Sequence, residues 1–158
     1  MIRKAKPYWA AFNAQSYIKE LTVGNIWLVH GYSNDIFQAN QDAQAAGRPF
    51  HIVQGVPKEG AVLAVDNMVI DKNAPRPDLA LKFINFMLDG RNSADLTNLI
   101  GSGNPNKDAM RYIKPELLKL PAVFPPPEFA KKLEQLKDLT IVQRRLRNKL
   151  WTEIKASK

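Results

Sequence analysis

The sequence predicts an α/β fold in which helices pack around a short mixed sheet. Residues 26–29, 61–65 and 68–70 are short apolar runs, as expected of strands that are buried on both faces. Longer amphipathic segments lie before, between and after the apolar sequences at residues 26–29 and 61–70, and several of them end at a glycine, the residue that most often terminates a helix. This alternation of strand and helix patterns is typical of α/β proteins.

The size and composition are those of a single globular domain. The chain has 158 residues, of which 45% are hydrophobic and 24% charged, so it can bury one sizeable core. It contains no cysteine, which excludes disulfides, thiolate catalysis and cysteine zinc sites. Its two histidines, His30 and His51, cannot form a three-histidine metal site. We expect no metal and no cofactor, and no catalytic signature indicates an enzyme.

The net charge of +8 admits two interpretations. A basic chain can bind nucleic acid or an acidic surface, but the basic residues here are spread along the sequence, which favours solubility as the explanation. The exception is a cluster at Arg144, Arg145, Arg147 and Lys149 in a predicted helix at residues 139–155. Because no aromatic stacking partner accompanies this cluster, we interpret it as a solvated face and expect no nucleic-acid partner.

A candidate ligand site follows the first predicted strand. Gly31 permits a tight turn into a helix at residues 36–46. Residues 32–35 therefore lie at the carboxyl end of a strand, where ligands bind in open α/β sheets. Tyr32 is either a packing residue or part of this site, and Asp35 is either a helix cap or a carboxylate that binds a ligand.

A second candidate is Asp66, which interrupts the apolar sequence between residues 61–65 and 68–70. A carboxylate in such surroundings is costly to bury unless it is paired or faces a cleft at the end of a strand. Two interpretations remain open, a structural ion pair with a basic residue and a contact to a cationic ligand.

Several other elements follow from local signals. We expect helices at residues 13–23, 78–88 and 94–100, ended by Gly24, Asp89-Gly90 and Gly101, with Ser93 as the cap of the third. Leu79, Phe83 and Phe86 or Met87 are spaced to face a core. The glycine-rich residues 101–107 lack the spacing of a phosphate-binding loop and are predicted to form a turn, with Asn106 as the cap of a helix at residues 107–112.

Seven short segments, taken in order, resemble the bacterial polyamine-binding proteins, which deliver putrescine or spermidine to ABC importers. The similarity extends from residue 6 to the tail and is greatest to the putrescine-binding branch. None of the segments is specific alone, but their order and spacing are. They are residues 31–39, 57–61, Asp66 with its apolar flanks, residues 80–88, 104–107, 124–126 and 147–155.

The resemblance implies a two-lobed clamp, the periplasmic-binding-protein type II fold, with the ligand between the lobes. It implies that Tyr32, where the family has a tryptophan, stacks against the polyamine, and that Asp35 and Asp66 pair with its amines. Ser102 occupies a ligand position often held by tyrosine, and Ala64 stands where an aromatic is usual. These two departures thin the aromatic wall, so another small cation, an amino acid or a metal chelate stays an alternative ligand.

By the same resemblance, residues 1–158 correspond to the second lobe with hinge-crossing segments of the first. Because the resemblance starts in the middle of the family pattern, the first lobe is expected to be absent. A signal peptide is also expected to be absent, since the initial residues lack its apolar core. We therefore expect a periplasmic, non-catalytic, solute-binding component whose partners are a polyamine, a membrane permease and the missing lobe. The apolar surface left bare would favour self-association.

Overall fold

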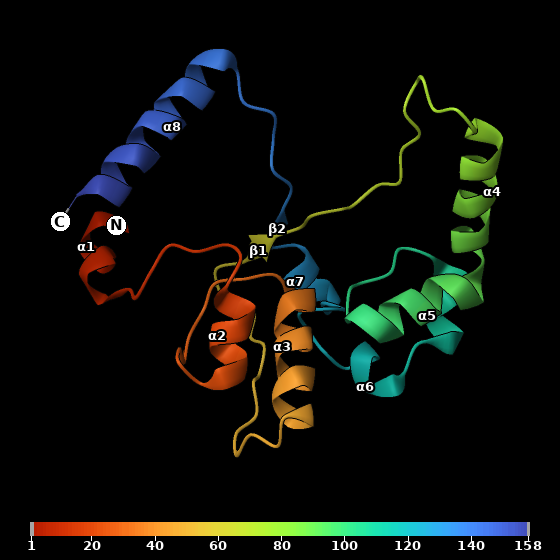
Figure 1. Ribbon diagram of the computed structural model, residues 1–158, viewed down its shortest axis with the longest axis horizontal. Helices are drawn as coiled ribbons and strands as arrows, with labels where there is room; N and C mark the ends of the chain where they lie inside the picture. Colours follow the sequence, from red (N-terminus) through yellow and green to blue (C-terminus); the bar gives the residue numbers. More distant parts are fainter. Residues whose placement is uncertain (1, 158) are drawn as a thin grey trace.

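The computed structural model describes residues 2–157, which form a helix-rich structure with one short sheet (Figure 1). The elements, in chain order, are α1 (Ile2–Ala5), η1 (Lys6–Tyr8), α2 (Tyr17–Val23), α3 (Ser33–Ala45), β1 (Ala61–Val62), α4 (Pro77–Leu88), α5 (Gly90–Ile100), η2 (Lys107–Tyr112), α6 (Pro115–Leu118), α7 (Pro127–Ala130), β2 (Leu133–Glu134) and α8 (Ile141–Ala156); η1 and η2 are 3-10 helices.

The sheet is smaller than the sequence predicts. Among residues 2–157 it consists of β1 and β2 alone, which run parallel with Ala61 opposite Leu133. The predicted mixed sheet is therefore wrong for this part of the protein, and residues 26–29 and 68–70 form no strand. A strand needs a neighbour to satisfy its backbone hydrogen bonds, and within residues 2–157 neither segment has a partner in a sheet.

The run at residues 26–29 is extended but only half covered. Ile26 and Val29 pack against a core cluster, whereas the side chains of Trp27 and Leu28 are 89% and 92% exposed. The expectation that both faces of this run are buried is wrong here, because the structure provides a layer on one side only. The alternation of covered and exposed side chains is that of a segment lying on one layer of helices.

Two clusters of buried side chains hold the central elements together. Tyr17 and Leu21 of α2 pack on Ile36 and Ala39 of α3, as the helical spacing predicts for α2. The second cluster joins α5, η2 and α6 and consists of Ala94, Ala109, Ile113 and Leu117. Phe37 of α3 packs against this second cluster, so α3 is the element that connects the two.

Glycines end the helices where the sequence predicts, but the predicted caps at the starts are partly wrong. Gly24 and Gly101 have left-handed backbone, with φ of 82° and 67°. Helix α3 begins at Ser33, three residues before the predicted start, and no side chain caps it, neither that of Asp35 nor those of Ser33 and Asn34, which have the residue types of a cap. Helix α5 is capped by Asp89, whose side chain accepts from two backbone amides, and not by Ser93.

Helix α4 stands apart from both clusters. Figure 1 shows it reached by a long extended segment from β1. The helix itself is confirmed, but Leu79, Phe83 and Phe86 do not face a core: the side chain of Phe83 is 58% exposed, and no α4 residue is buried. The apolar stripe predicted by the spacing exists, but among the described residues only an open hollow bordered by residues 68–70 lies against it, and it stays largely exposed.

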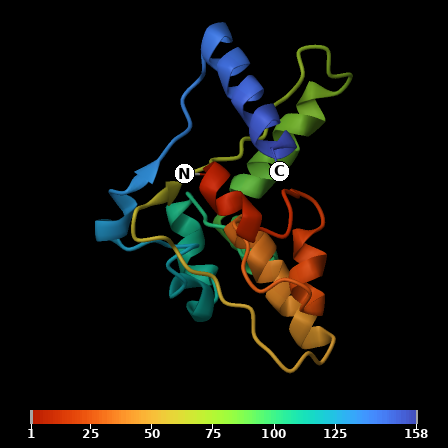
Figure 2. The same ribbon diagram turned by 90° about the vertical axis from the view of Figure 1, so that its left-hand side faces the viewer.

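The two ends of the chain lie together, as Figures 1 and 2 both show for α1 and the end of α8. Arg3 forms an ion pair with Glu153 at 2.9 Å, and the rings of Phe12 and Trp151 meet edge to face with centroids 5.1 Å apart. Helix α8 starts with a capping box. The side-chain oxygen of Thr140 accepts the backbone N–H of Gln143, and the side-chain oxygen of Gln143 accepts the backbone N–H of Thr140. The predicted final helix is therefore confirmed, although most of its apolar stripe is exposed.

Candidate functional site

Three of the four predicted ligand residues lie at the ends of helices. Tyr32 is the residue before α3, and its side chain is 68% exposed. Asp35 lies in the first turn of α3 and is half-buried. Ser102 follows Gly101 at the end of α5 and is also half-buried. The fourth, Asp66, is exposed on the extended segment between β1 and α4.

Asp35 is held by two side chains that approach from different directions. The hydroxyl of Tyr17, a buried residue of α2, donates to Oδ2 of Asp35. The amide of Asn34 donates to Oδ1 at 2.9 Å. Burial, reinforced by the hydrogen bond to Asp35, raises the pKa of Tyr17 to about 12, so this hydroxyl stays protonated at neutral pH. Asp35 is thus not a helix cap but a carboxylate with a fixed orientation.

The loop that carries Ser102 is fixed by one asparagine. Nδ2 of Asn104 donates to the backbone oxygen of Ser93 at 2.9 Å and to the hydroxyl of Thr97 at 3.0 Å. Oδ1 of Asn104 accepts the backbone N–H of Asn106 at 2.9 Å. Asn106 in turn caps η2 by accepting from the N–H of Asp108, as predicted. Residues 101–106 therefore form an irregular loop that Asn104 ties to α5, and not the predicted turn.

A contact between Phe37 and Gly101 brings this loop to α3. A Cβ placed on Gly101 would lie 2.3 Å from Cγ of Phe37, so the ring rests directly on the glycine backbone. Phe37 lies two residues after Asp35 on α3. The end of α5, with Ser102, is consequently docked on the helix that carries Asp35.

Asp66 has no comparable support. Among residues 2–157 its carboxylate takes part in no hydrogen bond or ion pair. The structural ion pair considered from the sequence is therefore absent in the described chain. The segment before Asp66 borders an open hollow of about 320 Å³ lined by Val62, Leu63, Ala64, Val65, Gln135 and Leu136. The structure does not bring Asp66 into contact with the anchored group at α3.

Neither Asp35 nor Asp66 is paired with a basic side chain among the described residues. The ion pairs of the described residues are Arg3 with Glu153 and Arg76 with Asp78, both on the surface. No lysine or arginine of residues 2–157 forms an ion pair with Asp35 or Asp66. Within the same residues, no group of three histidine, aspartate or glutamate side chains is arranged to hold a metal ion.

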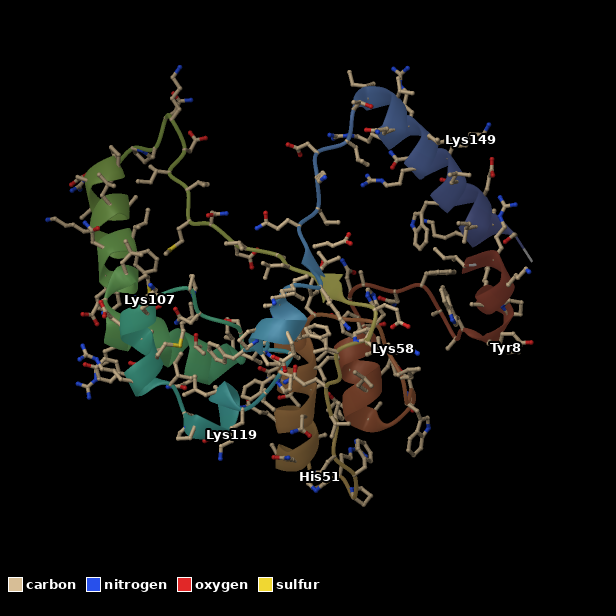
Figure 3. All side chains as sticks on the ribbon, turned by 180° about the vertical axis from the view of Figure 1, so that it is seen from behind. Tyr8, His51, Lys58, Lys107, Lys119 and Lys149 are labelled. Atoms are coloured by element: carbon tan, nitrogen blue, oxygen red, sulfur yellow. The ribbon has the colours of Figure 1, made fainter. Side chains whose placement is uncertain are left out.

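The remaining basic residues are dispersed. Figure 3 shows Lys58, Lys107, Lys119 and Lys149 on separate parts of the molecule. The arginines of α8 are exposed on one isolated helix. This arrangement agrees with a solvated basic face. No helix of the described chain combines the length and the apolar character that crossing a bilayer requires.

In the predicted helix at residues 13–23, the helical spacing of Tyr17, Ile18 and Leu21 indicates a core position for Tyr17 and no ligand role. Its spacing correctly predicts burial, and the side chain is 6% exposed. A tyrosine at a core position carries a hydroxyl that needs a hydrogen-bond partner, and this requirement was the available signal for a polar contact. The partner itself, Asp35, lies 18 positions further along the chain and could not be found from spacing.

Comparison with known proteins assigns the chain to a family. The profile of the bacterial extracellular solute-binding proteins matches residues 1–125, well over half of the sequence. This chain belongs to that family. The match includes all four predicted ligand residues.

Individual relatives are similar over almost the whole chain. A putrescine/cadaverine-binding protein of Pseudomonas aeruginosa is 61% identical over 155 residues, 98% of this chain and 44% of the relative. The putrescine-binding periplasmic protein SpuD of the same species is 34% identical over 98% of this chain and 42% of its own length. A spermidine/putrescine-binding periplasmic protein of Escherichia coli is 32% identical over 87% of this chain and 38% of its own length. The chain therefore spans less than half the length of these relatives.

Proposed function

We propose that these residues form the C-terminal part of a periplasmic receptor that captures polyamines, putrescine or spermidine, for an ABC importer. In this proposal the chain contributes the second lobe of a type II clamp and the hinge-crossing segments, and it catalyses no reaction. A membrane permease and the other lobe are its partners. Support comes from family membership and from three relatives whose names all include putrescine.

The observation that carries the proposal is the uncommitted, oriented carboxylate of Asp35. Each of its oxygens accepts one hydrogen bond from within the chain, whereas an ionised carboxylate offers about four lone-pair sites. Acceptor capacity therefore remains for an ammonium group, and no internal cation competes for it. A charge-assisted hydrogen bond of this kind contributes about 1.5–3 kcal/mol.

The other three residues complete a chemically matched set. The exposed ring of Tyr32 offers a face for the methylene chain or an ammonium of a polyamine, a contact of about 0.5–2 kcal/mol. Asp66 supplies a second carboxylate for the other amine of a diamine. Ser102 contributes a hydroxyl from the loop docked on α3. A flexible dication requires such a pair of separated carboxylates with apolar or aromatic surface between them.

The test is a chimera in which these 158 residues replace the matched part of the Pseudomonas aeruginosa putrescine/cadaverine-binding protein. We expect the chimera to bind putrescine, as measured by isothermal titration calorimetry. We expect the 158-residue chain alone to bind weakly or not at all, because its carboxylates face solvent without the other lobe. Micromolar or tighter binding by the chain alone would refute that expectation.

Matched substitutions test whether putrescine binding depends on the carboxylates of Asp35 and Asp66. In the chimera, Asp35→Asn and Asp66→Asn are each expected to weaken putrescine binding at least about tenfold, the equivalent of one lost charge-assisted hydrogen bond. Asp95→Asn is the control, since it removes the same charge from an exposed position on α5. Equal losses for all three variants would reduce the effect to net charge and contradict the assignment.

The alternative ligands are distinguished by the same protein. The positions of Ala64 and Ser102 carry small side chains where the resemblance implies aromatics, which leaves room for an amino acid, a metal chelate or another small cation. A thermal-shift screen of the chimera against diamines, triamines, amino acids and chelates would rank these classes. A larger shift with an amino acid or a chelate than with any diamine or triamine would overturn the polyamine proposal.

A further inference from the structure

One hydroxyl group connects two of the proposed ligand residues. The hydroxyl of Tyr17 donates to Oδ2 of Asp35 and, at 3.4 Å, accepts the backbone N–H of Tyr32. Tyr17 belongs to α2, while Tyr32 and Asp35 lie at the start of α3. The contact therefore ties the beginning of α3 to a buried side chain of the neighbouring helix.

The position of the Tyr17 ring is itself fixed by packing. Its side chain is 6% exposed within the cluster of α2 and α3. A Cβ at position 31 would lie 2.7 Å from Cε2 of Tyr17, so the ring lies against the backbone of Gly31. Because the Tyr17 ring is packed on both sides, it cannot move with the Asp35 carboxylate. The hydrogen bond therefore fixes the position of the carboxylate.

We propose that Tyr17 is a positioning residue for polyamine binding, which orients Asp35 and the backbone at Tyr32 before the ligand arrives. This inference rests on the proposed function and extends it to a residue that need not touch the ligand. A side chain that is already ordered loses little conformational freedom on binding, and ordering one mobile side chain weakens binding by roughly three- to tenfold.

The protonation state of Tyr17 is compatible with this role. Because burial and the Asp35 hydrogen bond raise its pKa to about 12, the hydroxyl remains a donor throughout the physiological range. Asn34 holds the other carboxylate oxygen at 2.9 Å, so removal of the Tyr17 hydroxyl leaves Asp35 in place but free to rotate. The expected defect is therefore in ligand affinity, with folding retained.

The test uses Tyr17→Phe in the chimera, because phenylalanine keeps the buried ring and removes only the hydroxyl. We expect the Kd for putrescine to rise about three- to tenfold. Tyr8→Phe is the matched control: it removes the hydroxyl of a side chain that is 89% exposed and should leave the Kd unchanged. In an Asp35→Asn background, Tyr17→Phe should raise the Kd by a smaller factor, since only the contact to the backbone of Tyr32 is then left to lose.

A second readout applies to the 158-residue chain without ligand. The carboxyl carbon resonance of Asp35 should shift in Tyr17→Phe, while that of Asp66 should not. An unchanged Asp35 resonance, or an unchanged Kd in the chimera, overturns the positioning role. An equal loss of affinity with and without the Asp35 carboxylate also overturns it, because the effect would then come from the fold. Failure of the parent chimera to bind putrescine instead refutes the proposed function itself.

Discussion

Gly101 is the position at which one added methyl group should test the docking of the Ser102 loop on α3. Its backbone is left-handed, with φ of 67°. A Cβ there would lie 2.3 Å from Cγ and 2.4 Å from Cδ1 of Phe37. Gly101→Ala therefore combines a strained backbone with a steric clash against Phe37, the α3 side chain that packs on the second core cluster.

The magnitude follows from these two contributions. A non-glycine residue in left-handed backbone costs about 1–2 kcal/mol, and an extra methyl group in a packed contact costs about 1–3 kcal/mol. We expect Gly101→Ala to lower the free energy of unfolding by about 2–5 kcal/mol. Gly47 supplies the control, because its φ is 63° and a Cβ there meets nothing within 4 Å. Gly47→Ala should show the backbone cost alone, about 1–2 kcal/mol.

Urea unfolding of the 158-residue chain, followed by far-UV circular dichroism, measures both variants. The difference between them isolates the clash with Phe37, and Phe37→Leu in the Gly101→Ala background should recover part of it. If Gly101→Ala is no more destabilising than Gly47→Ala, the ring does not rest on the glycine, and the docking of Ser102 on the Asp35 helix is refuted.

Three further predictions concern the helix cap of α8, the buried tyrosine and the exposed apolar surface. Thr140→Ala breaks the capping box and should lower the helicity and local stability of α8 by about 1 kcal/mol; hydrogen exchange at the amide of Gln143 detects this, with Thr152→Ala as a control that should change little. The pKa of Tyr17 is raised from 10.0 to about 12 in the folded chain, so its contribution to stability is complete below pH 10 and is lost as pH rises toward 12. In this pH range the unfolding free energy of the wild type should fall relative to that of Tyr17→Phe. Parallel curves of unfolding free energy against pH would contradict the raised pKa. Exposed side chains such as Leu28 and Val69 should make the isolated chain self-associate as concentration rises, whereas a concentration-independent monomer in sedimentation velocity would show that the apolar surface is tolerated in water.

The features predicted correctly from the sequence are those with local causes. Gly24 and Gly101 end helices because glycine reaches left-handed backbone without strain. Asn106 caps η2 because its side chain reaches an amide two residues away. The periodicity of α4 predicts a helix, since 3.6-residue spacing is a property of the segment itself. Each of these signals lies within a few residues of the structure that it specifies.

The features predicted wrongly depend on partners elsewhere. Residues 26–29 and 68–70 have the composition of buried strands, but a strand forms only beside another strand. The apolar stripe of α4 likewise needs a covering layer that residues 2–157 do not supply. Conversely, β2 was not predicted, because its two residues pair with β1 across more than 70 positions of sequence. The composition of a segment limits the structures that it can form, and its neighbours in the fold decide which of these it adopts.

In the candidate site, too, the positions of the ligand residues have local signals, whereas their supporting contacts depend on distant elements. Tyr32 and Asp35 are recognisable from their place after an apolar run, and their support by Tyr17 depends on two helices packing together. Asp66 is equally recognisable, yet it lies on an extended segment with no contact that fixes it. The two carboxylates therefore differ in what supports them: Tyr17 and Asn34 orient Asp35, whereas no hydrogen bond or ion pair among residues 2–157 orients Asp66.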